Sequence, residues 1–165
     1  MIVYIVRHAI AFERDDRKWP DDSERPLTSE GKARFRLVCR KLRKLGIGVD
    51  HVLSSGFVRA MQTAEILHQE CEWPTPEKLA ALEPGRNPVE VIKATARRDA
   101  AAIALVGHEP SLSELLACML TGVGSQAFGK FKKGGIACIE FKGRPAAGGG
   151  ELRWLATPGL LLAED

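Results

Sequence analysis

The chain has 165 residues, of which 45% are hydrophobic and 27% are charged, as in an ordinary globular protein. This length predicts a single domain over residues 1–165 with a sizeable buried core. The formal net charge of +3 is too small to indicate a nucleic-acid partner. A slight excess of positive charge fits an anionic ligand, although it does not identify one.

The cysteines and the N-terminal segment indicate the cellular compartment of the protein. Four cysteines are scattered through apolar surroundings, at Cys39, Cys71, Cys118 and Cys138. This pattern favours buried, reduced thiols in a cytoplasmic protein. No cluster of His, Cys and carboxylate residues predicts a metal site, so we expect neither a metal nor a cofactor. The first apolar run is short and ends at Arg7, so we expect no signal peptide and no membrane-spanning segment.

The first part of the chain predicts a strand, a loop and a helix. The apolar run over residues 1–6 is typical of a strand buried on both faces in a parallel sheet. Residues 9–25 are polar and without period, which predicts a long loop. Thr28 is the expected N-cap of a helix that ends at Gly46. One face of this helix is apolar. The other faces carry the basic residues Arg34, Arg36, Arg40, Lys41, Arg43 and Lys44. The basic faces indicate a solvated surface, with a docking face for an acidic partner as the alternative.

The rest of the chain continues the alternation of strands and helices. Asn87 and Ser111 begin two of the later helices, and the glycine-rich residues 143–150 form a hairpin loop. The expected strands cover residues 50–53, 78–82, 101–106, 136–141 and 151–157, and the expected helices follow residue 59, span 87–98 and end at residue 122. This order predicts an α/β fold with three α/β/α layers around a mostly parallel six-stranded sheet.

Polar residues follow several of these strands, at the edge where open α/β sheets bind ligands. Arg7 and His8 end the first strand, and His108 ends the strand over residues 101–106. Arg59 lies in the first turn of a helix, where free N–H groups favour an anion. Arginine suits phosphate oxygens, and a neutral imidazole can attack phosphorus. These residues predict a phosphate site, although each of them could also be a plain strand or helix terminus.

Two other residues at this edge are candidates. Ser55 precedes the helix that carries Arg59, and its hydroxyl either contributes to phosphate binding or caps the helix. Glu83 follows the short strand over residues 78–82. No phosphate-binding loop with the Gly-rich, Lys and Ser/Thr pattern is present, so the sequence does not support nucleotide-driven phosphoryl transfer.

Four short motifs together resemble the histidine phosphatase superfamily, also called phosphoglycerate mutase-like. Residues 7–9, Arg-His-Ala, are similar to its Arg-His-Gly signature, and residues 106–110, Val-Gly-His-Glu-Pro, to its second histidine motif. Residues 55–64, Ser-Gly-Phe-Val-Arg-Ala-Met-Gln-Thr-Ala, are similar to its Ser-Pro-x-x-Arg-Ala-x-Gln-Thr-Ala block, with Gly56 replacing the usual proline. Residues 25–31, Arg-Pro-Leu-Thr-Ser-Glu-Gly, form another block. The match covers nearly the whole chain and most resembles the SixA-type phosphohistidine phosphatases.

The resemblance implies a metal-independent phosphatase that works through a covalent phosphohistidine. His8 would be the nucleophile, while the phosphoryl oxygens would be bound by Arg7, Arg59 and His108. Glu83 falls in the region where larger relatives carry a proton-donating acid, with a plain turn as the alternative. A phosphohistidine substrate needs this acid less than an ester does, because its leaving group is an imidazole with a pKa of roughly 6.5.

Three functions fit these residues. The first is a cytoplasmic phosphatase in signal transduction that acts on a phosphohistidine protein, for example a histidine phosphotransfer domain. The second is a phosphatase for small phosphate monoesters, against which residues 72–82 leave no room for a lid insertion. The third is a phosphate-binding module without turnover. None of the three involves nucleic acid or a membrane.

Overall fold

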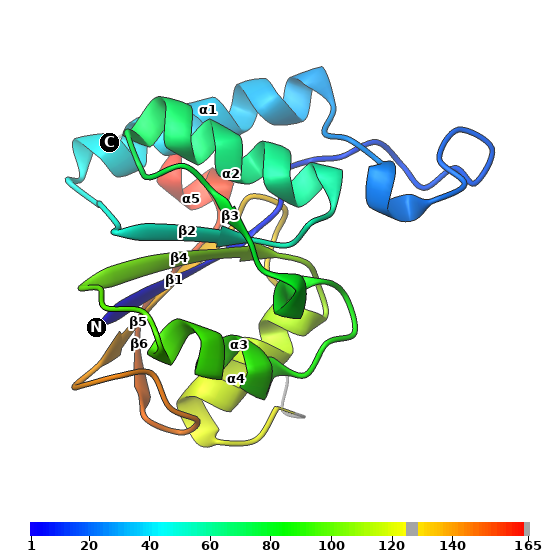
Figure 1. Ribbon diagram of the computed structural model, residues 1–165. Helices are drawn as coiled ribbons and strands as arrows, with labels where there is room; N and C mark the ends of the chain where they lie inside the picture. The colour runs from blue at the N-terminus through cyan, green and yellow to red at the C-terminus, as the bar shows by residue number, and fades with distance from the viewer. Residues whose placement is uncertain (125–128, 164–165) are drawn as a thin grey trace.

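A computed structural model describes residues 1–124 and 129–163 of the chain. Within these residues, one six-stranded sheet has the order β3-β2-β4-β1-β5-β6 (Figure 1). The strands are β1 (Ile2–Arg7), β2 (His51–Ser54), β3 (Glu77–Lys78), β4 (Ala102–Gly107), β5 (Ile136–Phe141) and β6 (Gly150–Ala156). The first four strands in this order pair in parallel. The strand β5 is antiparallel to both of its neighbours, β1 and β6. The predicted, mostly parallel sheet is therefore confirmed.

The helices cover both faces of the sheet, as Figure 1 shows. The α-helices are α1 (Ser29–Lys44), α2 (Val58–Cys71), α3 (Pro88–Ala96), α4 (Ser111–Thr121) and the short α5 (Pro158–Leu161). One buried cluster lies under α1 and α2 and includes Phe35 and Leu67. A second cluster lies under α3 and α4 and includes Ile92 and Leu115. Two apolar layers on opposite faces of one sheet are the predicted three-layer α/β/α arrangement.

The predicted helix caps are present. The Thr28 side-chain oxygen accepts a hydrogen bond from the Gly31 N–H at 2.9 Å, and Asn87 caps α3 through the Val89 N–H at 2.9 Å. Gly122 ends α4 with φ of 84°, a left-handed conformation that glycine adopts without steric cost. Local sequence thus sets where these helices begin and end.

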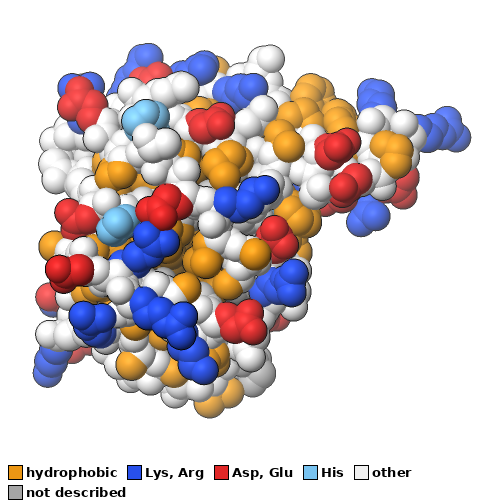
Figure 2. Space-filling model, viewed as in Figure 1, with side chains coloured by type: hydrophobic (Ala, Val, Ile, Leu, Met, Phe, Trp, Pro, Cys, Tyr) orange, Lys and Arg blue, Asp and Glu red, His pale blue; other side chains and the backbone are white. Residues whose placement is uncertain are grey.

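The structure differs from the sequence predictions in three segments. The strand expected over residues 78–82 is reduced to the two residues of β3, and Ala80–Leu82 form a 3₁₀ helix, η2. The expected loop over residues 9–25 contains the 3₁₀ helix η1 (Asp22–Glu24) and projects from the body of the molecule, with charged side chains of both signs (Figures 1 and 2). The helix α5 was not predicted, because four residues are too few for an apolar period to show.

All four cysteines are buried and carry free thiols, so their predicted burial is confirmed. Among the described residues, no helix has the length and the apolar character that crossing a bilayer requires.

Candidate active site

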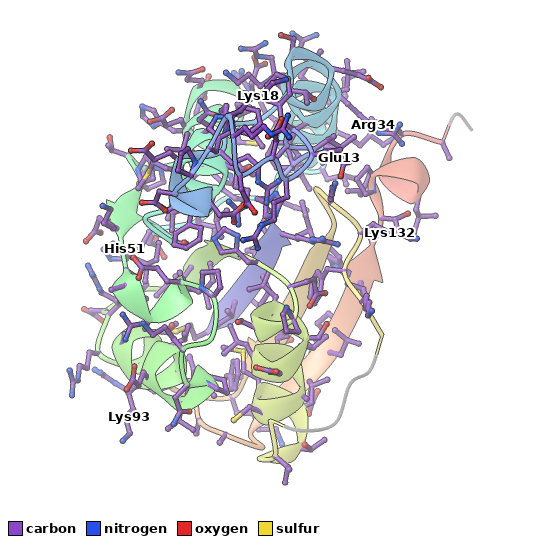
Figure 3. The ribbon with its side chains drawn as sticks, turned by 90° about the vertical axis from the view of Figure 1, so that its right-hand side faces the viewer. Glu13, Lys18, Arg34, His51, Lys93 and Lys132 are labelled. Carbon is purple, nitrogen blue, oxygen red and sulfur yellow. The ribbon has the colours of Figure 1, made fainter. Side chains whose placement is uncertain are left out.

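The two histidines predicted at strand ends meet at the carboxyl edge of β1 and β4, the edge toward which Figure 3 looks. Arg7 pairs with Gly107 in the parallel register, so the next residues, His8 and His108, emerge side by side. The His8 N–H donates to the Gly107 carbonyl at 3.0 Å, and the ring centroids lie 5.2 Å apart. Both side chains are buried, with His8 6% exposed and His108 2% exposed. Sheet register therefore builds the centre of the site.

His8 presents one defined nitrogen to the site. Its Nδ1 lies 2.7 Å from the Ala9 carbonyl oxygen, which can only accept, so Nδ1 carries the proton and the lone pair lies on Nε2. Burial lowers the pKa of His8 to about 3, against the hydrogen bond to Ala9 and with the help of the positive charges of Arg59 and Arg7. His8 is consequently a neutral imidazole near pH 7, the form that can act as a nucleophile.

His108 is held by Ser55. Its Nε2 lies 2.8 Å from the Ser55 hydroxyl oxygen, which also accepts a hydrogen bond from the Phe57 N–H at 3.3 Å. When the hydroxyl donates to Nε2, the proton of His108 lies on Nδ1. Burial lowers the pKa of His108 to about 2, and the positive charge of Arg59 acts in the same direction. Ser55 thus orients His108, and whether it also binds phosphate stays a prediction.

Three buried nitrogen atoms in the described part of the chain have no hydrogen-bond partner: Arg7 Nε, Arg59 Nε and His108 Nδ1. They belong to the three residues that the sequence predicts to bind phosphoryl oxygens. A buried donor without a partner costs about 1–3 kcal/mol, so such groups are rare unless a ligand or a water satisfies them. An anion with several acceptor oxygens would satisfy all three donors, and this supports a phosphate-binding site.

The other ends of both guanidinium groups are anchored. Arg7 Nη1 donates to the Phe131 carbonyl, and the Phe131 N–H donates to the carboxylate of Glu109. Burial lowers the pKa of Arg7, and the negative charge of Glu109 opposes this shift. Glu109 also accepts from the Ser113 hydroxyl at 2.8 Å, which ties this carboxylate to α4. Glu109 therefore positions Arg7 through Phe131, a role that the sequence does not reveal.

Arg59 is anchored by η1, a segment to which the sequence assigns no role. Its Nη1 donates to the Asp22 carbonyl at 2.7 Å and its Nη2 to the Asp22 carboxylate at 2.9 Å. Arg25 Nε donates to the same carboxylate at 2.7 Å, and the charge of Arg25 helps to lower the pKa of His8 and His108. Burial alone would raise the pKa of Asp22, but the two arginines outweigh it and the pKa is lowered. Arg25 was visible only as the first residue of a family motif.

Glu83 lies beside Gly56, the residue after Ser55. It follows η2, and its carboxylate is 3.8 Å from the Arg86 guanidinium. A Cβ atom at Gly56 would lie 3.1 Å from Glu83 Oε1 and 2.6 Å from Cε of Lys78. Glycine at this position therefore leaves room for two side chains beside the entrance to α2. Within the described residues, the hydrogen bonds and ion pairs of Glu83 do not reach either histidine, and its role as an acid stays a prediction.

The described residues contain no group of three or more His, Cys, Asp and Glu side chains that could hold a metal ion.

Comparison with known proteins agrees with the fold. Residues 3–86 match the model of the histidine phosphatase superfamily (branch 1). An uncharacterized protein of Picosynechococcus sp. (strain PCC 7002) is 39% identical over 118 residues, which cover 69% of this chain and 70% of that protein. The chain therefore belongs to the histidine phosphatase superfamily, a family of phosphatases.

Solved structures narrow the comparison within this family. The protein histidine phosphatase SixA complexed with tungstate superposes with a TM-score of 0.83 at 27% identity, over 96% of this chain and 97% of that one. A protein of Agrobacterium tumefaciens, proposed to be the phosphohistidine phosphatase SixA, has a TM-score of 0.75 at 20% identity, over 95% of this chain and 97% of that one. The fold is thus the phosphoglycerate mutase-like fold, and this chain is similar to SixA proteins over nearly its whole length.

Proposed function

We propose that this protein is a phosphohistidine phosphatase that removes the phosphoryl group from a protein histidine by way of a covalent phospho-His8. The observation that carries the proposal is the set of three buried, unpartnered nitrogens beside a neutral imidazole. The similarity to SixA supports the choice of substrate, and the tungstate in that relative is a tetrahedral oxyanion of the same charge type as phosphate.

The reaction has two steps. In the first, the substrate imidazole carries a proton on its other ring nitrogen, and the lone pair on His8 Nε2 attacks phosphorus. The bond from phosphorus to the substrate nitrogen breaks with its electron pair on that nitrogen, so a neutral imidazole leaves while His8 keeps its proton on Nδ1. In the second, a water oxygen attacks phospho-His8, the bond from phosphorus to Nε2 breaks, and inorganic phosphate leaves. The donors Arg7, Arg59 and His108 stabilise the negative charge on the non-bridging oxygens in both steps.

The leaving group decides how much help from an acid the reaction needs. When its other ring nitrogen is protonated, the substrate histidine leaves as a neutral imidazole, whose conjugate acid has a pKa of roughly 6.5, and it needs little assistance; an alkoxide needs a proton from a placed acid. Glu83 is the residue that we assign to this protonation when the substrate needs it. Its carboxylate lies beside Gly56, the residue after Ser55, which holds His108.

The substrate that we propose is a histidine phosphotransfer domain or a similar phosphohistidine protein, which places the enzyme in signal transduction. Only residues 72–79 connect α2 to η2, so no lid arises there to enclose a metabolite. The four free, buried thiols are consistent with the reducing cytoplasm that we propose as the compartment.

The test compares two substrates and three proteins in the presence of EDTA. Wild type, His8→Ala and the control His51→Ala, which lies at the start of β2 and away from both histidines, would be given a phosphorylated histidine phosphotransfer domain and p-nitrophenyl phosphate. We expect fast loss of the phosphohistidine, abolished by His8→Ala and kept by His51→Ala. Turnover of the aryl ester alone would indicate a small-molecule phosphatase, and binding without turnover would indicate a phosphate-binding module.

A further inference from the structure

A basic hollow adjoins the active site through Arg7. Its volume is about 470 Å³, and it lies between the start of α1, the turn before β5 and the start of α5. Besides Arg7, its charged lining residues are Arg34, Lys132 and Lys133. Figure 3 shows Arg34 and Lys132 on the same side of the molecule, with Lys93 on the opposite side. One water occupies about 30 Å³ in the liquid, so this hollow accommodates side chains rather than a single small ion.

In the part of the chain that the structure describes, three of the four positive charges of this hollow, those other than Arg7, have no carboxylate partner. No carboxylate there lies within ion-pair distance of Arg34, Lys132 or Lys133, and no acidic residue is among the lining residues. Glu13 lies on the same side in Figure 3 but forms no ion pair with them.

Three arginines further along α1 differ from Arg34, because each has a carboxylate partner. Arg36 and Arg40 lie 3.5 Å and 3.3 Å from the carboxylate of Glu70, and Arg43 pairs with Glu72. These three arginines therefore form ion pairs between α1 and the residues at the end of α2. Arg34 is the basic residue of α1 that lines the hollow next to the active site, so it is the part of the docking face considered in the sequence analysis that adjoins the site.

The turn before β5, which carries Lys132 and Lys133, is fixed relative to the nucleophile. The Gly134 N–H donates to the carbonyl oxygens of His8 at 3.0 Å and of Arg7 at 3.2 Å. The Gly135 N–H donates to the Lys132 carbonyl at 2.7 Å, and Gly134 has a φ of 76°, so the turn has one tight conformation. A partner that binds this turn is thereby held at a set position with respect to His8.

We propose that this hollow binds Asp or Glu side chains on the surface of the phosphohistidine protein, next to its phosphorylated histidine. The inference rests on the proposed function and adds a recognition site to it. Ammonium groups on flexible stems, outside the buried phosphate site, suit solvated carboxylates on a protein surface better than the bidentate binding of a second phosphate. Complementary charge of this kind accelerates association and fixes orientation.

The test compares two variants: one reverses two charges in the hollow, and the other reverses two charges elsewhere on the surface. The variant Arg34→Glu/Lys132→Glu changes two exposed side chains, and the control Lys93→Glu/Lys142→Glu changes the net charge equally at exposed positions outside it. Both proteins and the wild type would be assayed at low ionic strength on the phosphorylated histidine phosphotransfer domain and on p-nitrophenyl phosphate.

We expect the hollow variant to lose roughly tenfold in kcat/KM on the protein, mainly through KM, and to keep its aryl phosphate turnover. The control should match the wild type, and high salt should shrink the difference by screening. Equal kcat/KM for both variants would overturn the docking site while leaving the phosphatase function in place. Absence of wild-type activity on the phosphoprotein would overturn both. If the wild type and the control were dimers and the hollow variant were a monomer, the hollow would be a contact with a second copy of the chain, and the proposal would also be overturned.

Discussion

At the scale of single residues, a short chain of hydrogen bonds sets the tautomer of the nucleophile. The Ala9 carbonyl holds His8 Nδ1, and the Ala9 N–H donates to the Thr63 hydroxyl at 3.0 Å. The Thr63 hydroxyl in turn donates to the Arg59 carbonyl at 2.7 Å, one turn earlier in α2. One buried hydroxyl therefore links the residue after His8 to the helix that carries Arg59.

Replacing Thr63 by valine tests this link. The side chain keeps its shape, but the buried N–H of Ala9 loses its acceptor, and we expect the free energy of unfolding to fall by about 1–3 kcal/mol. We also expect a lower kcat, because the Ala9 carbonyl that orients His8 is no longer anchored. Urea denaturation and steady-state kinetics would measure both. Thr63→Ser keeps the hydroxyl and should stay close to the wild type; equal losses in the two variants would contradict the link.

The sequence predicts the residues of the site better than the contacts that hold them. His8 and His108 follow buried strands and Arg59 opens a helix, so each was visible from local pattern. Asp22 and Glu109 were not, because each acts on an arginine far away in the chain, and Asp22 and Arg59 are separated by 37 positions. No periodicity in a polar loop indicates which carboxylate will meet which guanidinium.

At the scale of elements, α1 meets the loop after β1 at a glycine. A Cβ atom at Gly31 would lie 2.1 Å from the Ile10 carbonyl oxygen, far inside any real contact. The same carbonyl accepts the Thr28 N–H at 3.0 Å, so the start of α1 and the residues just after His8 are packed backbone to backbone. This close approach is a physical reason for the glycine in the motif of residues 25–31.

We therefore expect Gly31→Ala to push Ile10 away and to disturb His8, two residues earlier. Overpacking of this kind costs about 1–3 kcal/mol or more, and here the clashing atom is backbone, which yields little. The prediction is a clear loss of stability by thermal melting together with a loss of phosphatase activity. Gly48→Ala is the matched control, since a Cβ there meets nothing within 4 Å. An alanine at position 31 that leaves both stability and activity unchanged would show that α1 does not fix this loop.

Elements with a strong apolar period were predicted and those without it were missed. The helices α1 and α4 and the strands β1 and β4 are long and buried on a regular pattern. Thr28 at the start of α1 and Gly122 at the end of α4 are ordinary capping residues. The strand β3 has two exposed residues, and the hydrogen bond from the Leu79 N–H to the Ser54 carbonyl places its end on β2. Pairing with a neighbour far along the chain, rather than a local pattern, defines such an element.

At the scale of the whole molecule, folding holds two imidazoles neutral inside a cluster of guanidinium groups. Burial lowers the pKa of His8 to about 3 and that of His108 to about 2, from an ordinary value of 6.5 in the unfolded chain. Below pH 6.5 the unfolded chain therefore binds protons that the folded chain does not bind. The stability that depends on these neutral histidines is complete above pH 6.5 and is lost as the pH falls toward 3.

We expect the free energy of unfolding to decrease between pH 7.5 and pH 5.0, by up to about 1.4 kcal/mol per pH unit for each histidine below 6.5. Asp22 does not contribute in this window, because its lowered pKa places its own loss of stability below its ordinary value of 3.8. Urea denaturation in phosphate-free buffers would compare the wild type with His8→Asn/His108→Asn, which keeps His51 and His68. The double variant should lose much of the pH dependence. Parallel curves for the two proteins would mean that the buried histidines are protonated in the folded state, which would also remove the neutral nucleophile from the proposed mechanism.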